Sequence, residues 1–291
     1  MSPADVVSRV LRWYDEAARD LPWRRPEATP WEVMVSEFML QQTPVERVLV
    51  PWRAWVDRWP TPVALAAAPS GEAVRAWGRL GYPRRALRLH QSAQRITAEH
   101  DGRVPDDSAA LLGLPGVGSY TAAAILSFAY GQRHVVLDTN VRRVLARVAS
   151  GVAYPPAATT SAEVALAERF LPRTRARAAR WAVASMELGA VVCTARSPRC
   201  DDCPVQSLCA WRAAGYPVWD GEPRRGQSYA GTDRQCRGVL LAVLRSTDGP
   251  VAAEELEVSW VDEVQRDRAL RSLLTDGLVV PAGPGAYALP H

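Results

Sequence analysis

The sequence predicts a mainly α-helical protein that carries one cysteine-rich loop and ends in a small module of the winged-helix type. Through the first 210 residues, apolar side chains recur at helical spacing, without the sustained alternation that is typical of strands. Four cysteines then fall within 17 residues, from Cys193 to Cys209. After a Gly-, Pro- and Arg-rich stretch, the chain has the pattern helix, helix, β-hairpin, which is the order of a small winged helix.

The first half of the chain is predicted to be a series of helices. Residues 4–19 have an apolar stripe at helical spacing, formed by Val6, Val7, Val10, Leu11 and Tyr14. Residues 31–42, which Pro30 precedes, are predicted to form the next helix, with Thr29 as its N-cap. Further helices are predicted at 44–59, 62–68, 71–77 and 84–100.

The second half alternates short helices with turns. Two helices flank the turn LPGVGS within 108–131, a third runs from Asp138 to about Val148, and others span 160–172 and 175–192. Residues 213–233 have the composition of a linker. Beyond it, helices are predicted at 238–245 and 262–275, and two short strands within 278–290.

Composition excludes several classes of function. The length of 291 residues allows about two domains. No apolar run approaches the ~18 residues of a membrane span, and the amphipathic, acidic N-terminus is unlike a signal peptide, so we expect a cytoplasmic protein without a membrane partner. All 35 Lys and Arg positions are arginines, which excludes a lysine Schiff base. The net charge of +4 permits a polyanionic partner without requiring one.

The four clustered cysteines have the spacing C-x6-C-x2-C-x5-C of a metal-binding loop. They are Cys193, Cys200, Cys203 and Cys209. Such a loop holds either a zinc ion or an iron–sulfur cluster, and the single C-x2-C pair favours a 4Fe–4S cluster while leaving zinc open. Arg196 and Arg199 either offset the thiolate charge or contact phosphates. We expect Cys236 to be a structural thiol.

Two polar features precede this loop. In LPGVGS, Gly116 and Gly118 either form only a tight connection or leave backbone N–H groups available to a phosphate. Twenty residues after Gly118, Asp138 follows an apolar run and begins a helix. Its carboxylate is either an ordinary N-cap or a functional group held at the helix start. His90 and His134 have no evident ligand partner and are expected to be structural or surface residues.

LPGVG, Asp138 and the four-cysteine spacing together resemble the helix-hairpin-helix base-excision DNA glycosylases, in one register over about residues 8–210. Endonuclease III and the adenine DNA glycosylases of MutY type share this frame. The resemblance implies a two-lobed helix-hairpin-helix fold, one 4Fe–4S cluster on the four cysteines, and double-stranded DNA as partner. It implies an iron–sulfur lobe at 1–29 and 138–212, a helical lobe with the hairpin at 30–137, a linker at 213–233 and a winged-helix-like module at 234–291.

The position after Ser119 separates the branches of this family. The endonuclease III branch has there the lysine that attacks the sugar, whereas this chain has Tyr120 and no lysine. A lysine-based lyase step is therefore excluded, which leaves a monofunctional glycosylase with water as nucleophile. SEFMLQQT resembles the adenine glycosylase motif, which implies that Glu37 protonates N7 of adenine. Burial beside Val33, Val35 and other apolar neighbours would raise the pKa of this acid.

Further matches imply which residues contact DNA. Gln41 and Gln42 would fill the gap in the duplex, and Tyr82, in a loop similar to the family's GLGYY, would insert beside the orphan base. RDLPWR would line the adenine pocket, and the hairpin glycines would bind the backbone. The pocket residues are Arg19, Leu21, Trp23 and Arg24, and the hairpin residues are Gly116 and Gly118. Taken without the resemblance, the aromatic residues are equally compatible with core packing.

Three positions depart from the family pattern. Pro83 replaces the second tyrosine of the loop and stiffens it, and Thr139 stands where glycine is usual. Val183 stands where Gln or Glu is expected, which puts one polar contact to adenine in doubt. Asn140 is retained and can hydrogen-bond Asp138.

The implied function is removal of adenine paired with 8-oxoguanine or guanine, in base excision repair, by a monomer. The adenine flips into the pocket and Glu37 protonates it. Asp138 then stabilises the oxocarbenium-like sugar, by charge or by a transient bond, while Tyr120 and Asn140 orient these groups. The alternatives are a mismatch thymine or uracil glycosylase of the same fold and a non-catalytic DNA-damage-binding protein. LQQT with Glu37 argues against the first, because a pyrimidine leaving group needs no acid at N7. The presence of both Glu37 and Asp138 argues against the second.

The C-terminal part departs most from the family. About 58 residues follow the predicted linker, too few for the Nudix-like domain that usually reads the oxidised guanine. Residues 268–280 would supply the last helix and first strand of a winged helix. Acidic residues around them leave open whether the module contacts DNA or only packs or binds a partner. These residues are Asp262, Glu263, Asp267 and Asp276.

Overall fold

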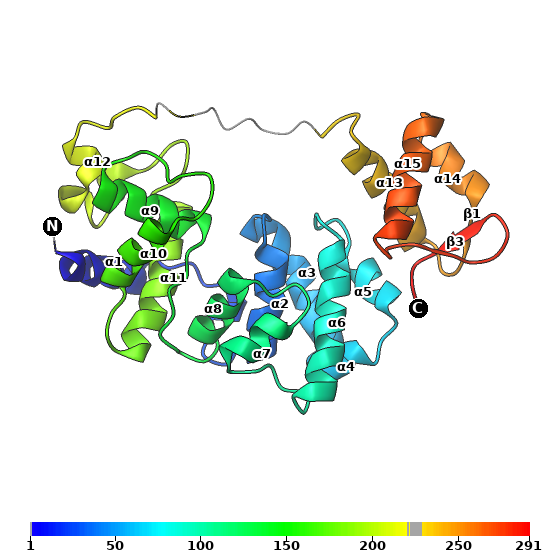
Figure 1. The fold of residues 1–291 in the computed structure, drawn as a ribbon, viewed down its shortest axis with the longest axis horizontal. Helices are drawn as coiled ribbons and strands as arrows, with labels where there is room; N and C mark the ends of the chain where they lie inside the picture. Colours follow the sequence, from blue (N-terminus) through cyan, green and yellow to red (C-terminus); the bar gives the residue numbers. More distant parts are fainter. Residues whose placement is uncertain (1, 220, 222–228) are drawn as a thin grey trace. The chain divides into compact units, whose positions relative to one another are not determined.

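The computed structural model of the chain describes residues 2–219, 221 and 229–291. It divides into two compact units, each considered by itself below (Figure 1). The first contains Met1–Val33, Asp106–Leu112 and Val117–Pro223, and the second contains Met34–Pro105, Gly113–Gly116 and Arg224–His291. Of the predicted linker, residues 220 and 222–228 lie outside the described residues. Every helix of the described part is too short or too polar to span a membrane.

The first unit is a bundle in which α11 packs against α1, α8 and α9. The apolar stripe predicted for the first helix is buried in this core, beside Phe170, Trp181 and Leu188. The described helices are α1 (Pro3–Ala17), α7 (Ser108–Gly113), α8 (Ser119–Phe128), α9 (Thr139–Ser150), α10 (Ser161–Phe170), α11 (Arg175–Val191) and α12 (Ala210–Ala213), with 3-10 helices η1 (Pro22–Arg24), η2 (Cys200–Asp202) and η3 (Gln206–Leu208).

The second unit has an aromatic core. The Trp55 ring lies edge-on to those of Trp59 and Trp77, at centroid distances of 4.8 and 5.6 Å. Against this core, α6 packs on α4 and α5. The helices before the C-terminal module are α2 (Pro30–Leu40), which begins in the first unit, α3 (Val45–Arg58), α4 (Pro62–Ala66), α5 (Ser70–Trp77) and α6 (Arg84–Glu99).

Residues 232–291 form a small C-terminal module within the second unit (Figure 1). Its elements are α13 (Asp233–Ser246), β1 (Val251–Ala252), α14 (Ala253–Ser259), α15 (Glu263–Thr275), β2 (Val280–Pro281) and β3 (Ala286–Ala288). The last strand is central and pairs antiparallel with both others, Val251 opposite Tyr287 and Val280 opposite Ala288. Helix α13 packs on α14 and α15 through leucines that include Leu240 and Leu244.

The predicted helices and C-terminal hairpin are confirmed, with differences in detail. Helix α2 ends at Leu40, so Gln41 and Gln42 lie in a turn instead of a helix. The helix predicted from Gly238 begins earlier, because Thr232 caps its N-terminus. Strand β1 and helix α14 were not expected, since a two-residue strand and a seven-residue acidic helix leave little periodicity. The predicted boundaries of lobes and module stay a prediction.

Candidate active site and cysteine loop

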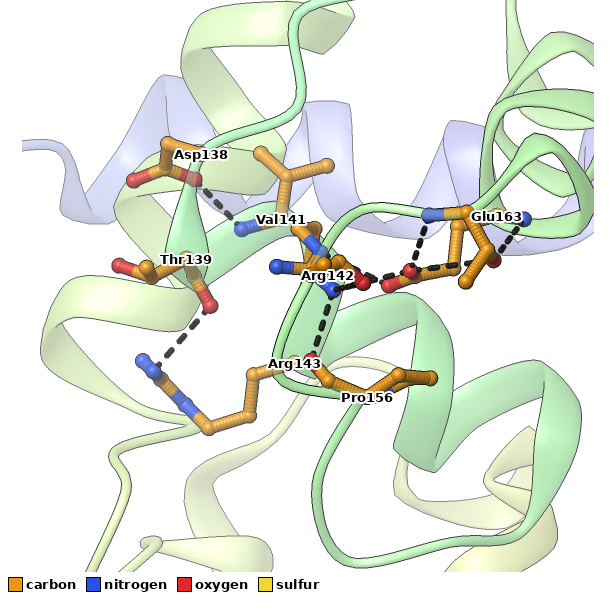
Figure 2. A network of polar contacts seen from close by, with 9 residues as sticks. Asp138, Thr139, Val141, Arg142, Arg143, Pro156 and Glu163 are labelled. Atoms are coloured by element: carbon orange, nitrogen blue, oxygen red, sulfur yellow. Dashed lines mark hydrogen bonds and ion pairs between the residues drawn. The ribbon is translucent and has the colours of Figure 1, made fainter. Parts of the chain in front are cut away.

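Asp138 lies at the N-terminus of α9, where both its carboxylate oxygens accept hydrogen bonds. Oδ1 accepts from the backbone N–H of Val141 at 2.6 Å, as expected of an N-cap, and Oδ2 accepts from the Asn140 amide at 2.6 Å (Figure 2 draws the first). Burial raises the pKa of Asp138, and these hydrogen bonds together with the charge of Arg143 offset only part of that effect. The structure therefore holds a carboxylate of fixed orientation in a poorly solvated position.

Arg143 connects this carboxylate to the cysteine loop. It donates to Oδ1 of Asn140 at 2.7 Å and to the carbonyl oxygens of Gly189 and Cys193, each at 2.7 Å. It also reaches the carbonyl of Thr139 at 3.3 Å (Figure 2). An unbroken set of hydrogen bonds thus runs from Asp138 through Asn140 and Arg143 to the main chain of Cys193.

Two neighbours fix the start of α9. Arg142 pairs with Glu163 of α10 at 2.8 Å and donates to the carbonyl of Pro156 at 2.8 Å (Figure 2). Gly189 of α11 lies so close to Asn140 that a Cβ on it would meet the Asn140 Cβ at 2.7 Å. Only glycine permits this approach, which brings the helix carrying Glu187 against the helix carrying Asp138.

The four cysteines line one cavity of the first unit, with Arg147 of α9. The guanidinium of Arg147 is 2% exposed and donates to Cys193 Sγ at 3.4 Å and to the carbonyls of Thr194 and Ala195 at 2.7 and 3.1 Å. Its charge lies over the Trp211 ring at 4.7 Å. A buried cation at the thiols offsets the negative charge that a thiolate-bound metal centre carries.

This donor set fits an iron–sulfur cluster. All four cysteines line the same cavity, and four cysteine thiolates are the ligand set of a 4Fe–4S cluster. Burial raises the pKa of Cys203 to about 12, so binding must displace a proton from this thiol.

The predicted pocket arginines meet on a residue that was not singled out from the sequence. Glu187 of α11 is fully buried and accepts from Arg19 Nε at 2.6 Å and from Arg24 Nη1 at 2.9 Å. Burial opposes ionisation of Glu187, but the two arginines outweigh it and lower its pKa. Leu21 and Trp23, between these arginines in sequence, are 4% and 5% exposed.

The other predicted residues of this unit lie near the start of α8 and on α11. Tyr120 packs at a small cluster formed by Ala124, Val136 and Ala182, and its hydroxyl is 3.9 Å from the sulfur of Met186. Val183, where a polar residue was expected, is partly buried. Gly118 is the N-cap of α8 with an extended backbone, and a Cβ there would meet nothing within 4 Å. The space before this helix terminus is thus open.

Glu37 belongs to the second unit. It lies in α2 and is 4% exposed, between the buried residues Ser36 and Phe38. The burial that was predicted for it is confirmed. Helix α2 begins with a capping box, in which Thr29 Oγ1 accepts from the Glu32 N–H at 3.2 Å and the Glu32 carboxylate accepts from the Thr29 N–H at 2.6 Å.

Arg85 joins the turn that contains Gln41 and Gln42 to the loop that contains Tyr82. Gln42 and Tyr82 both have φ of +54°, a conformation that is strained for residues with a side chain. The buried guanidinium of Arg85 donates to the carbonyls of Phe38 at 2.7 Å, Gln41 at 2.6 Å and Gly81 at 2.7 Å. It also lies 5.4 Å from the Tyr82 ring centroid. Tyr82 is 51% exposed, and Gln42 is exposed as well.

The first hairpin glycine is required by its surroundings. Gly116 has φ of +84°, and a Cβ there would meet Phe38 Cε1 at 2.9 Å and Arg88 Cβ at 3.0 Å. The hairpin segment is also fastened by Ser92, whose hydroxyl donates to the carbonyl of Pro115 at 2.6 Å. The tight connection predicted for LPGVGS is therefore confirmed.

Comparison with known proteins places the chain in a family. Residues 35–167 match the HhH-GPD superfamily base excision DNA repair proteins, and residues 193–209, from the first clustered cysteine to the last, match the iron–sulfur binding domain of endonuclease III. The chain is similar to the adenine DNA glycosylase of Mycobacterium tuberculosis (strain CDC 1551 / Oshkosh), with 56% identity over 97% of this chain and 93% of the relative. It is 54% identical to that of Mycolicibacterium smegmatis, over 99% and 96%.

A solved structure supports the fold. The structure of a thermostable thymine-DNA glycosylase matches with a TM-score of 0.65 and 27% identity, over 73% of this chain and 97% of that chain. The two-lobed helix-hairpin-helix fold and the single 4Fe–4S cluster expected from the sequence are thereby confirmed. The chain belongs to the adenine DNA glycosylases, within the HhH-GPD superfamily of DNA-binding base excision repair proteins.

Proposed function

We propose that this protein is a monofunctional glycosylase that removes adenine paired with 8-oxoguanine or guanine, acting as a monomer on double-stranded DNA of the bacterial nucleoid in the cytoplasm. The observation that carries the proposal is the presence of two carboxyl groups withdrawn from solvent, the buried Glu37 and the partly buried Asp138, in a chain that has no lysine. The family membership supports adenine as the base.

Glu37 is proposed to supply the proton. Adenine is a poor leaving group as an anion, and protonation at N7 makes it leave as a neutral base. As the C1′–N9 bond breaks, its electron pair goes to the purine and positive charge develops on the sugar. Water then adds to C1′ and returns its proton to Glu37. The products are free adenine and an abasic site in an unbroken strand.

Asp138 is proposed to stabilise the positive charge of the sugar. Its carboxylate is oriented in advance by Val141 and Asn140, so little reorganisation is needed when the charge appears. Tyr120 occupies the position of the family's lysine nucleophile and cannot form a Schiff base. We therefore assign Tyr120 and Asn140 to positioning.

The adenine pocket is proposed to be formed by Arg19, Leu21, Trp23 and Arg24. Their arrangement depends on Glu187, which holds both arginines through short ion pairs. We therefore add Glu187 to the predicted set, as the residue that positions the pocket arginines. Val183 of α11 has no polar group. The acidic residue that α11 contributes beside Arg19 is Glu187.

The remaining contacts are proposed to hold and open the duplex. The exposed Tyr82 would insert at the base step beside the mispair, and Gln41 and Gln42 would fill the space that adenine leaves. The open N-terminus of α8 at Gly118, with Gly116 before it, would receive a backbone phosphate. Cys193, Cys200, Cys203 and Cys209 would hold the cluster, which supplies structural support for this region.

A base-release assay tests the proposal. Duplexes with adenine opposite 8-oxoguanine, adenine opposite guanine, thymine opposite guanine and uracil opposite guanine are incubated with the protein, without lyase or alkali. We expect free adenine from the first two and an intact strand until alkali is added. Release of thymine or uracil alone would instead establish the mismatch glycosylase, and tight binding without release would establish a damage-binding protein.

A further inference from the structure

The C-terminal module is attached to α5 by two arginines that cap each other's helices. Arg245 of α13 donates to the carbonyls of Val74, at 2.9 Å, and of Gly78, at the C-terminal end of α5. Arg75 of α5 donates to the carbonyls of Arg245 and of Thr247, the latter at 3.0 Å, at the C-terminal end of α13. Each guanidinium thus satisfies carbonyls that a helix terminus leaves without a partner.

The attachment continues at the other end of α5. The backbone N–H of Gly71 donates to the carbonyl of Pro290 at 2.7 Å, and Ser70 Oγ donates to the carbonyl of His291 at 3.1 Å. A Cβ on Gly71 would meet the Pro290 oxygen at 2.3 Å, so this close approach requires glycine. The module therefore holds α5 at both of its ends.

These contacts surround the loop that carries Tyr82. The loop runs from Gly78, which Arg245 binds, to Pro83, and the next residue, Arg84, pairs with Asp276 of the module at 3.3 Å. Asp276 is itself held by Arg237 at 2.6 Å. The two flanks of the loop are thus bound to one module, while Arg85 donates to the carbonyl of Gly81 within the loop.

The charge of the module does not suit a DNA-reading surface. The exposed residues of α14 and the start of α15 are largely acidic: Glu254, Glu255, Glu257, Asp262, Glu263 and Asp267. Such a surface repels phosphates. By contrast, Arg237 pairs with Asp276 and Arg245 binds the carbonyl of Val74, both within the unit. Arg268 is paired with Asp233. Burial lowers the pKa of Arg245 to about 10, so it remains charged at neutral pH.

We infer that the C-terminal module is a positioning element for Tyr82: Arg245 and Asp276 fix the flanks of the Gly78–Pro83 loop and thereby hold Tyr82 ready to enter the duplex. The inference rests on the proposed function, since it assigns Tyr82 a task on DNA. Tyr82 has a strained backbone and a half-exposed ring, so its conformation persists only if the surrounding structure fixes it.

A double-mutant cycle tests whether Arg245 acts through Tyr82. Single-turnover release of adenine opposite 8-oxoguanine is measured for the wild type, Arg245→Leu, Tyr82→Ala and the double variant, corrected for iron content. Arg245→Leu should lower the rate roughly tenfold. In the Tyr82→Ala background the same change should alter the rate by less than about twofold, because the residue that it positions is already gone.

Matched variants separate positioning from stability. Arg268→Leu removes another arginine of the module, from an exposed pair, and should leave the rate unchanged. Asp276→Asn removes the second attachment and should behave like Arg245→Leu, and it replaces that variant if Arg245→Leu does not fold. Amide hydrogen exchange at Gly78–Tyr82 should speed up in Arg245→Leu and Asp276→Asn but not in Arg268→Leu.

The outcomes distinguish the two proposals. An equal fold-loss from Arg245→Leu in both backgrounds, or unchanged exchange in the loop, would overturn the positioning role alone. A wild-type rate in Tyr82→Ala would refute the proposed task of this tyrosine, and the positioning role would fall with it. Absence of adenine release by the wild type would overturn the proposed function itself.

Discussion

In the first unit, Arg143 and Arg147 of α9 bind carbonyl oxygens of the cysteine loop, whereas in the second unit Arg85 and Arg245 bind carbonyl oxygens at the ends of packed helices. Both pairs are buried or half-buried cations that set the main chain around candidate site residues. The two pairs of arginines differ in the structure around the carbonyls that they bind. The cysteine loop has only short 3-10 helices, whereas α5 contributes Trp77 to a tryptophan core and α6 packs on α5.

The candidate residues of each unit are therefore stabilised in a different way. Asp138 depends, through Asn140 and Arg143, on a loop that is shaped by its metal centre. Glu37 and Tyr82 depend on side-chain packing and on Arg85. Loss of the metal centre should therefore destabilise the first unit more than the second. Loss of a single arginine should destabilise the unit that contains it.

The largest expected effect comes from removing a cluster cysteine. Cys203→Ala should abolish iron binding and adenine release, because the binding free energy of a structural metal site is a large part of the folding free energy around it. Iron content, base release and hydrogen exchange would be measured together. Protection should be lost in α9 and the cysteine loop and retained in α3 to α6. Cys236→Ala, which removes a buried thiol of α13, should keep its iron. Equal loss of protection in both units would disprove the contrast.

A smaller loss is expected from the link between the loop and the carboxylate. Arg143→Leu leaves the carbonyls of Gly189 and Cys193 without a donor and frees Asn140 to turn away from Asp138. The single-turnover rate should fall roughly 10- to 100-fold with little change in affinity for the duplex. Arg169→Ala, at an exposed position of α10, is the control. A weaker affinity with an unchanged rate would argue that Arg143 serves DNA binding instead.

The corresponding change in the second unit is Arg85→Met. It leaves the carbonyls of Phe38, Gln41 and Gly81 without this donor, which should cost about 1–3 kcal/mol of stability. Iron content should stay at the wild-type level, in contrast with the cysteine variant. Thermal unfolding and iron analysis check both statements. Loss of iron from this variant would show that the units are not supported separately.

The smallest expected effect is a pH-dependent difference in stability. Burial raises the pKa of Asp138 in the native state above its ordinary value of 3.8. Between 3.8 and the raised pKa, the native state binds more protons than the unfolded state. The contribution of Asp138 to stability therefore falls as pH rises through this window. Asp138→Asn removes that penalty, so its Tm relative to the wild type should be higher at neutral pH than near pH 3.8. A constant difference across this range would contradict the role of burial.

Much of the fold could be predicted from the sequence, because helical periodicity, N-caps such as Asp138 and the cysteine spacing are local signals. Glu37 and Asp138 were also found, through motifs with fixed spacing. Glu187, Arg85 and Arg143 were missed as positioning residues, since each has a partner far away in sequence: Arg19 for Glu187, the Gln41 carbonyl for Arg85 and the Cys193 carbonyl for Arg143. In a chain where all 35 Lys and Arg positions are arginine, residue type alone does not distinguish the ones that bind carbonyls.

The most direct test of the account compares the wild type with Glu37→Gln. Glutamine keeps the size of the buried side chain but has no acidic proton to give. Single-turnover release of adenine opposite 8-oxoguanine is measured for both, with iron content and duplex affinity as controls. The account predicts a loss of roughly 10²- to 10⁴-fold in rate, with iron and affinity unchanged. Full adenine release by Glu37→Gln would contradict the assignment of the acid and with it the proposed mechanism.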